Sequence, residues 1–91
     1  AYDSDTKKAI QIIKEVLLNN SNVVSEPSAQ VGIQRFAESS IELGYRYWVP
    51  TTEYYLVMYE VNELILNRFN QENIVIPFPQ RELRITNQTD Q

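Results

Sequence analysis

The stretch that decides the fold is residues 74–85, which read IVIPFPQRELRI. Successive N–H groups of an extended chain point to opposite edges, so Pro77 and Pro79 remove two donors from the same edge. Each proline also holds the residue before it in an extended conformation. We therefore predict a strand that enters a sheet, loses its pairing on one edge at the prolines and leaves as a stiff connector. From Arg81 to Ile85, apolar and polar residues alternate again, as in a strand.

Two segments upstream have the period of amphipathic helices. The first, from about Asp5 to Leu18, follows N-cap candidates in residues 3–6. Its apolar stripe comprises Ala9, Ile10, Ile13, Val16 and Leu17. The second runs from about Thr52 to Asn70, with Thr51 or Thr52 as its cap. Its wider stripe comprises Tyr54, Val57, Met58, Val61, Leu64, Ile65 and Phe69. A turn at residues 71–73 is expected to follow.

Two short segments between these helices alternate as strands do. Val31 and Ile33 begin the first, and a shift of the apolar register at residues 35–37 indicates a bulge or the strand's end. The second has Ile41, Leu43, Tyr45 and Tyr47 on one face and Glu42, Gly44, Arg46 and Trp48 on the other. We predict an antiparallel hairpin in which Gly44 gives room to a backbone or a bulky ring. Trp48, on the polar face, is expected to cover a sheet surface or to meet a neighbouring chain.

The order of these elements is helix, strand, strand, helix, strand. If Ala1-Tyr2 is the end of an earlier strand, the order becomes βαββαβ, the split β-α-β arrangement of ferredoxin-like folds. This predicts one α+β domain over residues 1–91, with two helices on one face of a mostly antiparallel sheet and the first strand largely missing. Residues 81–91 are expected to start a C-terminal extension. Because the missing strand is usually central, we expect copies to exchange or add strands.

Length, charge and composition narrow the class of protein. Folding of 91 residues buries roughly 60–65% of the chain's surface, and a hydrophobic content of 43% supplies a packed core. The chain has no cysteine, no apolar run of about 20 residues and no leader, so we expect it to be soluble by itself. Its net charge of -4 is scattered, which argues against nucleic acid and anionic lipid surfaces as partners.

Catalytic and cofactor sites have little support in the sequence. Without His or Cys, the commonest base, the best neutral-pH nucleophile and the usual zinc ligands are missing. Ser39-Ser40 beside a glutamate is typical of a turn, and Asp3 and Asp5 of a helix cap rather than a metal site. The two glycines stand apart, so no phosphate-binding loop is present. We expect no enzymatic activity, no metal and no cofactor.

Five segments occur in the order and spacing of one known family. They are Tyr2-Asp3-Ser4-Asp5, Ser39-Ser40-Ile41, Arg46-Tyr47-Trp48-Val49, Asn67-Arg68-Phe69-Asn70 and the Ile-x-Ile-Pro-Phe-Pro-Gln run that ends at Gln80. With them the chain resembles the C-terminal α/β part of the cytoplasmic vestibule of bacterial small-conductance mechanosensitive channels. The resemblance implies a fragment of a larger membrane channel.

What the resemblance implies about function is structural. It implies a homoheptamer on the cytoplasmic side of the inner membrane of a bacterium, with this domain in the assembly of a vestibule that filters solutes. The whole channel would protect bacteria against hypo-osmotic shock, with the membrane reached only through preceding segments. Pro77, Phe78, Pro79 and Gln80 match the family's exit motif toward a small barrel made by all subunits. These four residues and Trp48 are the expected structural motif and subunit contacts.

Two alternatives remain open at the level of sequence. Residues 43–49 superficially resemble the aromatic strand of RNA-recognition domains, although Tyr45 and Tyr47 share the face of Ile41 and Leu43, which indicates burial in the core. A ferredoxin-like domain that senses a small molecule at a subunit interface is the other alternative. The pairs Tyr54-Tyr55 and Tyr47-Trp48 are expected to serve core or interface packing rather than a ligand cage.

Overall fold

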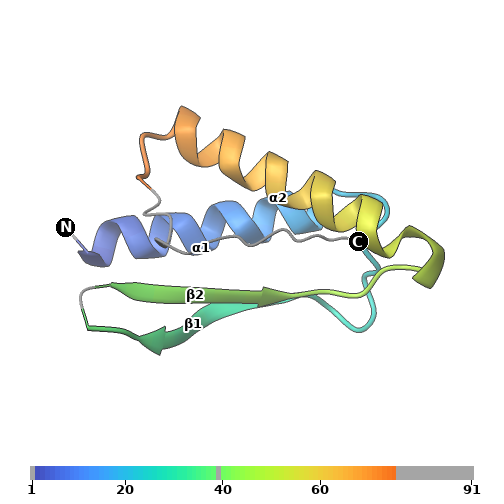
Figure 1. The fold of residues 1–91 in the computed structure, drawn as a ribbon, viewed down its shortest axis with the longest axis horizontal. Coiled ribbons are helices and arrows are strands. Elements are labelled where there is room, and N and C mark those ends of the chain that lie inside the picture. Colours follow the sequence, from blue (N-terminus) through green and yellow to red (C-terminus); the bar gives the residue numbers. More distant parts are fainter. Residues whose placement is uncertain (1, 39, 76–91) are drawn as a thin grey trace, which may run out of the picture.

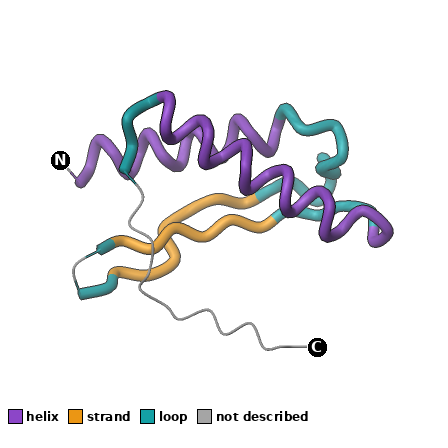
Figure 2. Tube along the Cα trace, turned by 45° about the horizontal axis from the view of Figure 1, so that its top comes forward, coloured by secondary structure: helices purple, strands orange, loops and turns teal. Residues whose placement is uncertain are grey.

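The computed structural model describes residues 2–38 and 40–75. The elements, in chain order, are α1 (Tyr2–Leu18), β1 (Gln30–Phe36), β2 (Ile41–Arg46), the 3-10 helix η1 (Thr51–Glu53) and α2 (Tyr54–Gln71). Both α-helices lie on the same side of the hairpin and run in roughly opposite directions (Figures 1 and 2). The α+β class and the placement of the helices on one face are confirmed.

The strands β1 and β2 form the predicted antiparallel hairpin. Val31 faces Tyr45 and Ile33 faces Leu43, whereas the next pair is Arg35 with Glu42, so Gln34 is the extra residue of a bulge. The bulge therefore lies one residue before the predicted register shift, and β1 ends at Phe36.

Gly44 gives room to a side chain rather than to a ring or a backbone. A Cβ on Gly44 would collide with Oε1 of Gln34 and would lie 3.2 Å from the Cβ of Gln34. The extra residue of the bulge thus occupies the space that the glycine leaves. A close neighbour at Gly44 was expected and is present, but it is the side chain of Gln34 and not the predicted backbone or aromatic ring.

The core lies where the two helices meet above the hairpin. Its buried residues are Ala9, Ile12, Ile13, Val16 and Leu17 of α1, Val57, Val61, Ile65 and Phe69 of α2, and Ile74. Val31, Leu43, Tyr45 and Tyr47 pack against this cluster from the hairpin. The helical period is therefore correct, but on α1 Ile12 takes the buried place predicted for Ile10, which is only half-buried.

The predicted ends of both helices need correction. Tyr2 and residues 3–5 lie within α1, so Tyr2 is not the end of a strand and Asp3 and Asp5 are not caps before the helix. Acidic residues are favoured in the first turn as well as at the cap, which is why the pattern did not separate the two positions. Before α2, the Glu53 N–H donates to the Pro50 carbonyl over 2.9 Å, and no side chain of Thr51 or Thr52 caps the helix.

The end of α2 is a Schellman motif, in which a residue of left-handed conformation closes the helix. Asn73 has φ of 61°, its N–H donates to the Asn70 carbonyl over 3.2 Å, and the Ile74 N–H donates to the Phe69 carbonyl over 2.8 Å. Phe69 and Ile74 are both buried, which supplies the apolar contact of the motif. The predicted turn at residues 71–73 is present, although α2 continues through Gln71.

The structure describes only the first two residues of the strand predicted at residues 74–85. Ile74 and Val75 are in neither a helix nor a strand. Pro77, Phe78, Pro79 and Gln80, together with the extension at residues 81–91, lie outside the described residues, as do Ala1 and Ser39.

Candidate functional site

Trp48 is the one predicted contact residue that falls within the described part of the chain. It follows β2 rather than belonging to it, and its side chain is 39% exposed. Its carbonyl accepts a hydrogen bond of 2.8 Å from the Val24 N–H, which fixes this segment to the loop after α1. The indole is therefore held by an ordered backbone and is accessible to a neighbouring molecule. That Trp48 contacts a subunit stays a prediction.

A larger exposed apolar surface lies on α2. We name this surface the tyrosine face; its residues are Tyr55, Tyr59 and Leu66, with Tyr54 and Leu56 at the start of the helix. Tyr54, Tyr55, Leu56 and Tyr59 are between 54% and 69% exposed. Contiguous apolar surface of this kind marks interaction sites on soluble domains.

The tyrosine rings of this face touch one another. The ring centroids of Tyr54 and Tyr55 are 5.0 Å apart in an edge-to-face arrangement, and those of Tyr55 and Tyr59 are 6.4 Å apart. Tyr55 and Tyr59 are four residues apart and so share one side of the helix. The sequence prediction put Tyr54 and Leu64 in the buried stripe, but both are exposed, at 54% and 40%. The signal that could have revealed the face is the presence of large residues outside the predicted stripe, at Tyr55, Tyr59 and Leu66.

Tyr45 and Tyr47, in contrast, turn toward the helices. The Tyr45 hydroxyl donates to Oδ1 of Asn62 on α2 over 2.5 Å, and the two rings lie parallel with centroids 6.4 Å apart. Burial raises the pKa of Tyr45, and burial followed by the proximity of Tyr45 and Tyr54 raises the pKa of Tyr47. These rings are therefore not a platform for stacking bases.

The outer face of the hairpin is polar, and both of its arginines are hydrogen-bonded to side chains across the strands. Nε and Nη2 of Arg35 donate to the two carboxylate oxygens of Glu42 over 3.1 and 2.6 Å, and Nε of Arg46 donates to Oε1 of Gln30 over 2.8 Å. The hydrogen bonds from Arg35 are the main cause of the lowered pKa of Glu42. A basic surface that could attract RNA phosphates is thus absent from the hairpin as the structure describes it.

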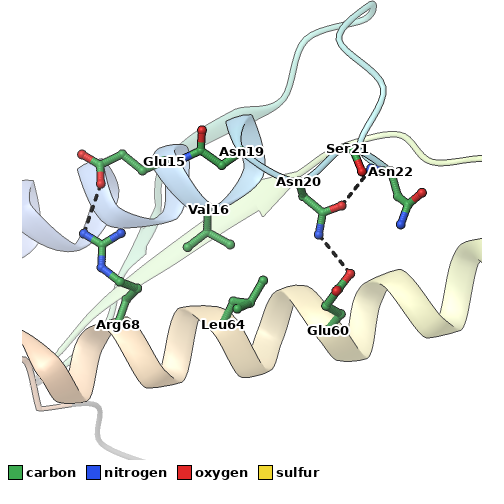
Figure 3. Close-up of a pocket in the computed structure, with 9 residues that line it drawn as sticks. All are labelled: Glu15, Val16, Asn19, Asn20, Ser21, Asn22, Glu60, Leu64 and Arg68. Atoms are coloured by element: carbon green, nitrogen blue, oxygen red, sulfur yellow. Dashed lines mark hydrogen bonds and ion pairs between the residues drawn. The ribbon is translucent and has the colours of Figure 1, made fainter.

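A groove of about 370 Å³ lies between α2, the end of α1 and the loop that follows (Figure 3). Nη2 of Arg68 contacts Oε1 of Glu15 at 3.1 Å and Oε2 of Glu72 at 3.6 Å. Nδ2 of Asn20 donates to Oε1 of Glu60 over 3.1 Å. The pKa of Glu15 is lowered, first by its hydrogen bond with Gln11 and then by Arg68.

Arg68 is thus ion-paired with Glu15, and Glu60 is hydrogen-bonded to Asn20; these two contacts tie α1 and the loop after it to α2. Over residues 2–38 and 40–75, no group of three or more acidic side chains is arranged to hold a metal ion. Neither α1 nor α2 has both the length and the apolar character required to span a bilayer. The described residues therefore present an exposed apolar face and a bonded polar groove.

The comparisons with known proteins agree with this arrangement of two helices on a hairpin. A family model described as the C-terminal region of the mechanosensitive ion channel MscS matches residues 1–76. The chain belongs to the MscS family. The match ends before Pro77, so the exit motif lies beyond it. MscS channels are not an enzyme class, and the sequence resemblance is confirmed.

Relatives within the MscS family are found in archaea and bacteria. An uncharacterized MscS family protein of Archaeoglobus fulgidus is 33% identical over 87 residues, which are 96% of this chain and 31% of the relative. One from Synechocystis is 30% identical over 84 residues, 92% of this chain and 28% of the relative. The small-conductance mechanosensitive channel of Edwardsiella ictaluri is 22% identical over 93% of the chain and 30% of its own length. The chain thus spans less than a third of these relatives.

Proposed function

We propose that this MscS-family domain is a structural and assembly domain in the cytoplasmic vestibule of a mechanosensitive channel. Its task is to hold the pore subunits in register and to shape the space through which solutes reach the pore. The observation that carries the proposal is the family match over residues 1–76, joined by the exposed tyrosine face on the outside of α2. A buried core with an unpartnered aromatic face is what a subunit of an oligomer needs.

The finer features of this function follow from the family resemblance. The whole channel is a homoheptamer in the inner membrane of a bacterium, with this domain on the cytoplasmic side, and it releases solutes during hypo-osmotic shock. Residues 77–80 lead the chain out of the domain toward a shared barrel, and Trp48 contributes to subunit contacts. Self-association supplies the domain's partner, and neither a cofactor nor a nucleic acid takes part.

The test of the proposal disrupts the domain inside the full-length channel. Val61 has no exposed surface, so Val61→Asp places an unpaired carboxylate in the core and unfolds the domain. Asn67→Asp introduces the same side chain at an exposed position of the same helix and serves as the matched control. We expect Val61→Asp to lower the yield of the channel oligomer and the survival of cells after a hypo-osmotic shock, and Asn67→Asp to change neither.

An assembly role would be rejected by normal oligomer yield and normal survival in cells that carry Val61→Asp. The isolated Val61→Asp domain should be shown by circular dichroism to have lost its helices. This measurement ensures that the channel was tested with an unfolded domain.

A further inference from the structure

We infer that neighbouring copies of this chain bind through two different helix faces, the tyrosine face of α2 on one copy and a lysine-bearing face of α1 on the next. The inference rests on the proposed assembly function and adds which surfaces meet. It is carried by the charges, exposure and spacing of the two faces.

The lysine face consists of Lys7, Gln11, Lys14 and Leu18. The spacing of these residues is four, three and four, so they form one stripe along α1. All four are exposed, and Leu18 is 84% exposed although it follows the buried Leu17. Lys8 pairs with Glu72 at 3.2 Å, and no ion pair engages Lys7 or Lys14 among the side chains that the structure describes, which do not include those of residues 1–4. Both lysines are exposed, so their ammonium groups can be reached by a partner.

The tyrosine face is flanked by charge of the opposite sign. Glu53, Glu60 and Glu63 lie in η1 and the first part of α2, where no lysine or arginine occurs before Arg68. Arg68 itself is engaged by Glu15 and Glu72. Exposed tyrosine rings beside carboxylates attract ammonium groups, through the negative face of the ring and through ordinary charge attraction. The occupant that fits the tyrosine face is therefore a lysine-bearing helix, and α1 of a second copy is one.

Charge also decides which kind of contact forms. Two tyrosine faces against each other would bring glutamates together, and two lysine faces would bring ammonium groups together, so self-complementary pairing is disfavoured. Pairing of unlike faces leaves one free face of each kind on every dimer. Such head-to-tail contacts extend into a ring when the rotation between copies closes.

The two faces also match in length. Lys7–Leu18 and Tyr55–Leu66 contain the same number of residues, and each spans roughly 16 Å. The helices α1 and α2 run in opposite directions within a copy (Figure 1). A small rotation between ring neighbours preserves this relation between α1 of one copy and α2 of the next. In the resulting antiparallel contact Leu18 lies opposite Tyr55 and Lys14 opposite Tyr59.

The experiment uses two one-sided variants of the 91-residue chain, observed by native mass spectrometry. Lys7→Gln with Lys14→Gln disables the lysine face, and Tyr55→Ala with Tyr59→Ala disables the tyrosine face. We expect each double variant to associate with itself at least tenfold more weakly than the parent. An equimolar mixture of the two should form heterodimers and no larger species, because one intact face of each kind remains. Circular dichroism should show parent-like helix content for both.

The control for net charge is Ser25→Glu with Ser28→Glu, at two exposed loop positions. It changes the net charge by the same amount as the two lysine substitutions and should associate as the parent does. A parent that associates while both variants associate equally well overturns the inference and leaves the assembly function standing. Folded variants whose mixture forms no heterodimer also overturn it, since only a contact between unlike faces is restored by mixing. A parent that stays monomeric overturns the inference and the assembly function together.

Discussion

The left-handed conformation of Asn73 closes α2, and substitutions at this position test how much that helix end contributes to stability. With φ of 61°, Asn73 is in the left-handed region, where a side chain with a Cβ costs roughly 1–2 kcal/mol and a β-branched one more. Asparagine is among the residues that tolerate this conformation best. We therefore expect Asn73→Val to lower the free energy of unfolding by about 2 kcal/mol. Asn73→Gly should stay within about 0.5 kcal/mol of the parent, because relief of the clash offsets the greater freedom of the unfolded chain.

The assay is thermal unfolding followed by circular dichroism at low protein concentration, where association does not contribute to stability. For a domain of this size 1 kcal/mol corresponds to roughly 4–8 °C, so Asn73→Val should melt about 8–16 °C below the parent. The matched control is Asn70→Val, at an exposed position within α2, where asparagine and valine have similar helix propensities, so a change of less than about 0.5 kcal/mol is expected. The reasoning is refuted if Asn73→Val melts with the parent, or if Asn70→Val is equally destabilising.

Three further outcomes are expected. Leu17→Ala should lower the free energy of unfolding in urea by about 3 kcal/mol, because Leu17 is 2% exposed. Leu18→Ala, at 84% exposure, should change it by less than about 0.5 kcal/mol. Equal effects of the two substitutions would show that Leu17 is not a core residue. NMR titration should place the pKa of Glu42 below its ordinary value, and Arg35→Gln should raise it. Because folding lowers the pKa of Glu42, the stabilisation by the Arg35–Glu42 pair is complete above the pKa of Glu42 in the unfolded chain and is lost as pH falls through its pKa in the folded protein. A stability difference between the parent and Arg35→Gln that persists below both pKa values would refute this role of the pair. Emission of Trp48, the only tryptophan, should shift to shorter wavelength as concentration rises, and unchanged emission would exclude it from the contact.

The helices and the hairpin were predictable because their apolar residues repeat with the period of each element. Val57, Val61, Ile65 and Phe69 are buried as expected of one stripe, and Val31 and Tyr45 pair across the hairpin. The register shift at residues 35–37 predicted a bulge or the strand's end, and the structure has both, with the bulge at Gln34 and the end at Phe36. Where the extra residue sits depends on which side chain Gly44 admits, and that is a contact between strands.

The ends of the helices were harder to predict, since several local solutions satisfy the same free N–H groups. Thr51 and Thr52 have the chemistry of caps, but a 3-10 turn with a backbone hydrogen bond to Pro50 takes their place. Tyr2 continues the helix rather than ending a strand. At helix ends the sequence therefore limits the possible capping arrangements but does not determine which one forms.

The candidate interaction site was only partly predictable. Trp48 was expected to cover a sheet surface or to meet a neighbouring chain; it is 39% exposed, and its contact stays a prediction. The tyrosine face was not anticipated. A helical wheel ranks residues by their side of the helix, and how much of that side is covered depends on tertiary packing. Tyr54 shows this, because it lies on the predicted stripe and is nevertheless exposed. The residues of the exit motif, Pro77 to Gln80, remain a prediction of the sequence.

The central claim, that this domain exists to assemble with copies of itself, is tested most directly by sedimentation velocity on the 91-residue chain over a wide range of concentration. The account predicts a weight-average sedimentation coefficient that rises with concentration, toward a species larger than a dimer. A folded chain that sediments as a monomer at every concentration would contradict it.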